Sequence, residues 1–238
     1  MDSTLALDHD ATPTTRAPVR GWLGWFAVAL VVGMQAGTLF KPLGTVGETR
    51  VADWVDLLTP YVLLGCAAMV LARAGAARGP WILFGVGAVT FTLGHGLHLS
   101  ANSVSNVTDA VVARASIVHL WDEVVSHWIW YTGLFLVLAA LAWGLRGRTF
   151  RVGVPGVVLA LLVALTLTNT YIEGGTPWLG VLFLAAAVVA GLLTRPDPVS
   201  RVLLLVGGAG VVLLVGWGVY WALADGSLFP QVSDLGWI

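Results

Sequence analysis

Seven apolar runs, most of them about 20 residues long, constrain this chain more than any other feature of its sequence. A helix rises about 1.5 Å per residue, so roughly 20 apolar residues cross the ~30 Å hydrocarbon core of a bilayer. Hydropathy and helix-breaking residues predict membrane spans over 21–40, 54–73, 81–101, 118–145, 152–172, 178–194 and 202–223. Only 11% of the residues are charged, against about a quarter in soluble domains. We therefore predict an all-α polytopic transmembrane bundle with seven spans.

The distribution of basic residues predicts how this bundle is oriented. Cytoplasmic connections of membrane proteins are enriched in Lys and Arg. Nine of the 12 basic residues fall on the N-terminal side of the predicted spans, and three fall on the other side. The N-terminus is therefore expected inside and, after seven spans, the C-terminus outside. We expect a disordered cytoplasmic tail over 1–20, a transmembrane domain over 21–224 and a short extracytoplasmic tail over 225–238, in what we take to be a prokaryotic plasma membrane.

Four of the five histidines fall between His95 and His127, and their spacing places them on two helical faces. The spacing i, i+3, i+7 puts three polar residues of the third predicted span on one face: His95, His98 and Asn102. The spacing i, i+4, i+8 does the same in the fourth predicted span for His119, Glu123 and His127. Two facing helices can thus present several imidazoles and a carboxylate to one another.

Counting 1.5 Å per residue from the predicted span ends brings His95, His98, Glu123 and His127 close to one depth in the outer leaflet. Imidazole nitrogen and carboxylate oxygen without thiolate suit zinc or non-haem iron. We predict a divalent metal site with His95, His98 and His127 as ligands and Glu123 as a fourth ligand or as the general base. His119, about one turn further out, is a further candidate ligand.

Other polar residues at the same predicted level are candidates for supporting roles. Asp122 is expected to accept a hydrogen bond from a ligating histidine or to assist catalysis. Asn169, Tyr171 and Glu173 end the fifth predicted span and are candidates, with Asn102, for contacts to a substrate. The sequence carries no nucleotide-binding loop and no basic patch of the kind that binds nucleic acid.

The chain resembles the membrane hydrolase superfamily of alkaline ceramidases and adiponectin-receptor-like proteins, which also places histidines and carboxylates at the ends of helices in a seven-span bundle. In that superfamily a serine, an aspartate and three histidines surround a zinc ion. The resemblance implies that this protein cleaves a lipid amide. The resemblance lets His95 or His98 stand for the early histidine and Asp122 for the aspartate. The family's pair of histidines in the final helix has no counterpart here, because no histidine follows His127.

Three functions fit these observations. The first is a membrane metalloenzyme that acts on a lipid or another amphiphile at the outer leaflet, hydrolytic with zinc and oxidative with iron. The second is a sensor or transporter of metal ions or protons that uses the same cluster without catalysis. The third is a haem protein with His95 and His127 as axial ligands, which leaves Glu123 without a role.

Overall fold

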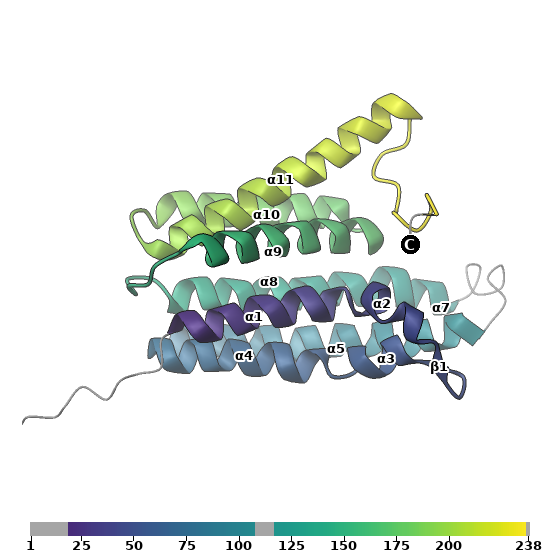
Figure 1. The fold of residues 1–238 in the computed structure, drawn as a ribbon, viewed down its shortest axis with the longest axis horizontal. Coiled ribbons are helices and arrows are strands. Elements are labelled where there is room, and N and C mark those ends of the chain that lie inside the picture. Colours follow the sequence, from purple (N-terminus) through teal and green to yellow (C-terminus); the bar gives the residue numbers. More distant parts are fainter. Residues whose placement is uncertain (1–18, 108–116, 237–238) are drawn as a thin grey trace, which may run out of the picture.

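The computed structural model describes residues 19–107 and 117–236, and these residues form a bundle of long helices (Figure 1). The long helices are α1 (Val19–Met34), α4 (Thr59–Ala74), α5 (Arg78–Val107), α8 (His127–Gly144), α9 (Val154–Glu173), α10 (Pro177–Leu193) and α11 (Pro198–Ala224). In Figure 1, α9, α10 and α11 lie on one side of the molecule, and α1, α4, α5 and α8 lie on the other. Each long helix coincides with one predicted span, although the predicted tail over 1–20 falls mainly outside the described residues.

Short elements interrupt or extend the predicted spans near one end of the bundle. They are α2 (Ala36–Leu39), a 3₁₀ turn (Lys41–Leu43), the antiparallel strands β1 (Thr45–Val46) and β2 (Thr49–Arg50), α3 (Val51–Asp56), α7 (Ile117–His119) and the π-helix η2 (Leu120–Ser126). The first predicted span therefore breaks after Met34, and the second begins within the short helix α3 and is interrupted between Asp56 and Thr59. Hydropathy averages over such breaks, so the sequence does not reveal them.

Five stretches of the described helices are long and apolar enough to cross a membrane: Val51–Ala74, Arg78–Val104, Ile117–Gly144, Val154–Glu173 and Pro198–Ala224. The helices α1 and α10 are equally apolar but have only 16 and 17 residues. Large apolar side chains remain exposed on the bundle surface, among them Leu193 at 78% and Leu223 at 84%. These features are those of an integral membrane protein whose surface contacts lipid.

Glycines let α5 and α8 pack very closely. A Cβ atom built on Gly94 would lie 2.2 Å from the backbone nitrogen of Trp130, and one on Gly133 would lie 2.1 Å from that of Phe91. Small residues are enriched where membrane helices approach one another, because they let the backbones meet. This contact fixes the register of the two helices and brings His98 on α5 next to His127 on α8, with their ring centroids 4.8 Å apart.

Three connections meet at one end of the bundle, which we call the basic end. The backbone N–H of Gly147 donates to the Asp197 carboxylate over 3.0 Å, and the Arg148 side chain donates to the Gly75 carbonyl over 3.1 Å. These bonds join the α4–α5, α8–α9 and α10–α11 connections. The basic residues carried by these connections and the adjoining helix ends are Arg73, Arg78, Arg146, Arg148, Arg151, Arg195 and Arg201.

The residues after α11 fold back over the turn between α9 and α10, as Figure 1 shows for the yellow trace. We call residues 227–236 the C-terminal strap. Phe229 of the strap packs against Trp178 with ring centroids 5.3 Å apart, and Trp217 donates to the Pro230 carbonyl over 3.0 Å. The segment predicted as a short tail is therefore a packed part of the fold.

Candidate active site at the acidic end

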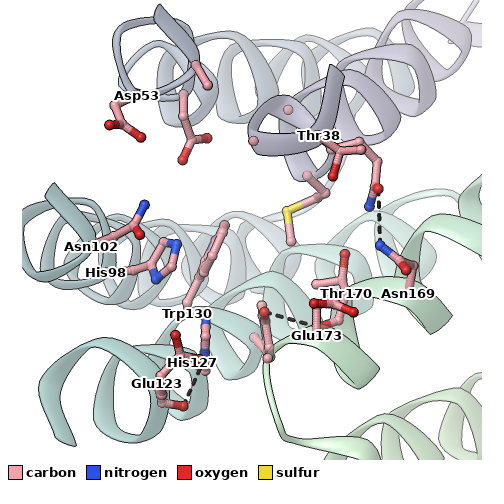
Figure 2. Close-up of a pocket in the computed structure, with 18 of the residues that line it drawn as sticks. Thr38, Asp53, His98, Asn102, Glu123, His127, Trp130, Asn169, Thr170 and Glu173 are labelled. Carbon is pink, nitrogen blue, oxygen red and sulfur yellow. Dashed lines mark hydrogen bonds and ion pairs between the residues drawn. The ribbon is translucent and has the colours of Figure 1, made fainter. Parts of the chain in front are cut away.

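A cavity of about 220 Å³ lies at the end of the bundle opposite the basic end (Figure 2). Residues from α1 to α3 line one side of it, and residues from α5, η2, α8 and α9 line the other. Its polar and aromatic lining residues are Gln35, Thr38, Arg50, Asp53, Asp56, His98, Asn102, Glu123, His127, Trp130, Tyr131, Asn169, Thr170 and Glu173. Six residues predicted for the site thus line one cavity: His98, Asn102, Glu123, His127, Asn169 and Glu173.

The lining of this cavity is acidic. Four carboxylates, those of Asp53, Asp56, Glu123 and Glu173, face one guanidinium, that of Arg50. Arg50 is already paired with the buried Asp53, with its Nη2 atom 2.7 Å from Oδ1 and its Nε atom 3.1 Å from Oδ2. The remaining carboxylates give the cavity a negative potential, which favours a cationic ligand. We call this end of the bundle the acidic end.

His98 and His127 form the centre of the cavity wall, as Figure 2 shows. His98 Nδ1 lies 2.9 Å from Asp122 Oδ1, and His127 Nδ1 lies 2.9 Å from the Glu123 carbonyl oxygen. The Glu123 carboxylate is 3.7 Å from the same His127 nitrogen. Both imidazoles therefore contact the short segment 122–123 through Nδ1.

Tyr131 packs beside His127 in the cavity wall. It stacks on His127 at 5.2 Å and donates to the Thr170 carbonyl over 3.2 Å. A Cβ atom built on Gly174, in the turn after α9, would lie 2.4 Å from the Tyr131 hydroxyl, so the absence of a side chain at Gly174 lets this turn lie against Tyr131.

His95 lies apart from this pair. It is 2% exposed, and its Nε2 atom is 3.1 Å from Asp56 Oδ1, which also accepts a hydrogen bond from Thr59. The Trp130 ring contacts His95 edge-on at 5.0 Å and stacks on His98 at 5.1 Å. Trp130 therefore lies between His95 and the pair formed by His98 and His127.

The π-helix η2 explains how the fourth predicted span presents its carboxylates. A π-helix turns less per residue than an α-helix, and such segments are frequent at functional sites. Asp122 is buried and reaches His98, while Glu123 lines the cavity with its side chain 37% exposed. His119 precedes η2, is exposed and lies outside the cavity lining, so of the three residues predicted to share a face only Glu123 and His127 line the cavity.

Glu173 and Tyr171 do not present free functional groups to the cavity. The Glu173 carboxylate accepts hydrogen bonds from the backbone of Val232 and from Ser233, whose hydroxyl is 2.8 Å away. Tyr171 is 2% exposed, contacts Tyr131 edge-on at 5.4 Å and does not line the cavity. Asn169 donates to Gln35 over 3.1 Å and joins α9 to the break after α1.

Among the described residues, two polar atoms in the cavity wall are buried with neither a hydrogen bond nor an ion pair: Trp130 Nε1 and Thr170 Oγ1. Their residues are 5% and 6% exposed, so bulk water does not satisfy them. An unsatisfied buried polar group costs about 1–3 kcal/mol, and in a native fold it calls for a water molecule or a ligand. The indole N–H can only donate, so its missing partner is an acceptor such as a ligand oxygen.

Within residues 19–107 and 117–236, no three or more His, Cys, Asp and Glu side chains are grouped so that they could hold a metal ion. The nearest approach to such a group is the pair His98 and His127 with the Glu123 carboxylate beside it. An exposed carboxylate can reorient, whereas the two imidazoles are held in place by their Nδ1 contacts and by Trp130.

Eight polar or aromatic residues of this cavity were not singled out in the sequence, among them Asp53, Asp56, Trp130 and Tyr131. Trp130 and Tyr131 follow His127 at i+3 and i+4, the spacing of one helical face, and that signal was available. Asp53 and Asp56 stand i, i+3 at the start of the second predicted span. The contact between Asp56 and His95 joins residues 39 positions apart, and a local pattern does not predict it.

Comparison with known proteins gave no match. No protein-family model matches the chain, and neither does any curated protein or solved structure.

Proposed function

We propose that this protein is an integral membrane metalloenzyme that acts on a lipid or another amphiphile in the cavity at the acidic end. The observation that carries this proposal is the pair His98 and His127, each with its Nδ1 atom held by an oxygen of the segment 122–123. Histidines that bind metals usually donate their other ring N–H to a carboxylate or a backbone carbonyl, which orients the ring. His127 has that arrangement, and His98 Nδ1 lies at ion-pair distance from the Asp122 carboxylate.

The ligands we propose are His98 and His127 through Nε2, with the Glu123 carboxylate as third ligand or as base. Two imidazoles and one carboxylate are a known donor set for catalytic zinc and for non-haem iron. Binding requires Glu123 to turn from its place beside His127. The Asp56 carboxylate adds a negative potential that favours a divalent cation.

His98 and His127, with Glu123, would hold a divalent ion, which would supply Lewis acidity to a substrate oxygen or to a water molecule. Asp122, 2.9 Å from His98 Nδ1, would orient the His98 ring. Glu123, when it is not a ligand, lies within the same cavity and would serve as the general base. The Trp130 N–H and the Thr170 hydroxyl, for which the described residues supply no hydrogen-bond partner, would orient a polar group of the substrate.

The surroundings of the cavity favour an amphiphilic substrate. Apolar helix surfaces exposed to lipid flank a polar cavity, so one molecule can keep its chain in the bilayer and place its head group among the polar residues. The resemblance to the ceramidase-like membrane hydrolases makes a lipid amide the first substrate to test. We further propose that all seven long helices cross a prokaryotic plasma membrane, with the N-terminus inside and the acidic end outside.

Metal analysis with an absorption spectrum, on full-length protein purified without added metal, tests the proposal. We expect about one zinc or iron ion per chain in the wild type. His98→Ala and His127→Ala should each lose most of it, because each removes a ligand. His119→Ala is the matched control, since it removes an exposed histidine outside the cavity lining and should leave the metal content unchanged.

The identity of the metal then decides the reaction to assay: amide or ester hydrolysis for zinc, oxygen-dependent oxidation for iron. If the protein binds metal through His98 and His127 but catalyses neither hydrolysis nor oxidation, the result would support a sensor in place of an enzyme. Wild-type protein that binds neither metal, even after it is supplied, would refute the metal site. A haem between His95 and His127 gains no support from the fold, because Trp130 contacts both rings.

A further inference from the structure

A second cavity, of about 310 Å³, lies at the basic end between the turn after α4 and the C-terminal end of α8. Its charged lining residues are Arg146 and Arg148, and the rest of its lining is small or apolar, including Ala76, Pro80 and Trp143. Both arginines are exposed, and the Trp143 side chain is 52% exposed. A ligand can therefore reach this cavity from the surface of the bundle.

The turn that carries the two arginines is held in a defined conformation. Gly147, between them, has a φ of 68°, a left-handed conformation that glycine adopts without strain. Its N–H is bound by the Asp197 carboxylate, and Arg148 is bound to the Gly75 carbonyl. Leu145, just before the turn, is 2% exposed and anchors it in the core. The arginines are thus positioned at the cavity by contacts to two other connections.

The charges of these arginines are not neutralised by neighbouring side chains. Among the residues that the structure describes, neither Arg146 nor Arg148 is paired with a carboxylate. Asp197, on the adjacent connection, uses its carboxylate to bind the Gly147 backbone. Two guanidinium groups beside an apolar cavity leave a local positive potential, which favours an anionic ligand.

We infer that this cavity binds the phosphate group of an anionic membrane phospholipid. Guanidinium groups present planar N–H donors that match phosphate oxygens, and they keep their charge at any physiological pH. Basic pockets between membrane helices bind the head groups of anionic lipids, and tryptophan favours the bilayer interface where these head groups lie. Arg146 and Arg148 hold the phosphate, and Trp143 packs along the glycerol and the adjoining acyl chain.

This inference is independent of the proposed metal site, which lies at the other end of the bundle. Its test uses the full-length protein in detergent micelles, titrated with phosphatidylglycerol, phosphatidylcholine or inorganic phosphate, with bound lipid counted by native mass spectrometry. The variant Arg146→Gln with Arg148→Gln removes both charges and keeps side-chain donors. The control, Arg195→Gln with Arg201→Gln, removes two exposed charges at the same end but outside the cavity lining.

We expect one saturable phosphatidylglycerol per chain and an affinity loss on the order of tenfold or more in the cavity variant. The control variant should keep the wild-type affinity, and thermal unfolding should show both variants folded. Equal losses in the two variants, or equal affinity for phosphatidylcholine, would show only a general surface charge effect and overturn the inference. Inorganic phosphate that displaces the lipid only at far higher concentration confirms the lipid as the ligand. Displacement by phosphate at equal concentration overturns it in favour of free phosphate.

Discussion

At the residue scale, the acidic end is built from three histidines that each lie against a carboxylate or its backbone. His95 pairs with Asp56, His98 with Asp122, and His127 with the Glu123 carbonyl. Only the last two rings line the cavity, and Trp130 separates them from the first. We therefore assign His95 to the support of the site and keep His98 and His127 as the proposed ligands.

Replacing His95 with leucine should reduce stability but keep the metal. The substitution leaves the Asp56 carboxylate with Thr59 as its one remaining side-chain partner, and an unsatisfied buried group costs about 1–3 kcal/mol. Thermal unfolding in detergent should show a lower midpoint, while metal content stays at the wild-type level.

The double variant His95→Leu with Asp56→Leu provides the control. Removing both partners should cost less than the sum of the single changes, because neither His95 nor Asp56 is then left facing an apolar side chain; the Thr59 hydroxyl loses its acceptor in the double variant as it does in Asp56→Leu alone. Loss of metal in His95→Leu to the same extent as in His127→Ala would instead place His95 among the ligands.

At the element scale, the packing of α5 on α8 sets the geometry of the site. Gly87, Gly94 and Gly133 line this contact, and a side chain on any of them would lie under 3.0 Å from the facing backbone. The sequence spacing predicts which histidines share a face of α5, but the distance to α8 depends on these glycines.

Gly94→Ala and Gly96→Ala form a matched pair on α5 that tests this dependence. A Cβ on Gly94 would lie 2.2 Å from the Trp130 nitrogen, so α5 and α8 must separate, whereas a Cβ on Gly96 meets nothing within 4 Å. We expect Gly94→Ala to lose about 1–3 kcal/mol of stability, as overpacked cores do.

Gly96→Ala should be neutral or slightly more stable, because alanine favours a helix over glycine by about 1 kcal/mol. Thermal unfolding and metal content measured on both variants separate the two effects. If both variants behave alike, the α5–α8 contact does not control the site.

Hydropathy located all seven long helices because lipid-facing and buried residues are apolar alike, so each apolar run stands out. It could not show the π-helix η2, which depends on how the backbone around Asp122 and Glu123 fits against α5. The even spacing of His119, Glu123 and His127 assumed α-helical geometry throughout, and this is why His119 was grouped with the site. Asp56 was missed because its contact with His95 joins it to a distant helix.

At the scale of the whole molecule, the two ends of the bundle differ in charge and in the ligand each favours. The acidic end gathers carboxylates and imidazoles around one cavity, and the basic end gathers arginines around another. Apolar helix surface lies between them. The C-terminal strap belongs to the acidic end, where Val232 and Ser233 bind the Glu173 carboxylate at the edge of the cavity.

Truncation after Gly226 should lower the thermal midpoint by several degrees. It removes the partners of Glu173 and the packing of Phe229 against Trp178, and it leaves a carboxylate at the cavity edge without its donors. Thermal unfolding in detergent measures the change. Truncation after Gly236 keeps these contacts and serves as the control, so an equal midpoint for the two proteins would mean that the strap does not contribute to stability.

The strap also makes position 236 an indicator of the compartment that the cavity faces. Because Val232 and Ser233 of the strap bind Glu173, a reporter fused after Gly236 through a flexible linker stays on the same side of the membrane as the cavity. One fusion carries an enzyme that is active only in the periplasm, and the other carries a fluorescent protein that matures only in the cytoplasm. The fusion that gives a signal identifies the compartment from which the cavity takes its ligand.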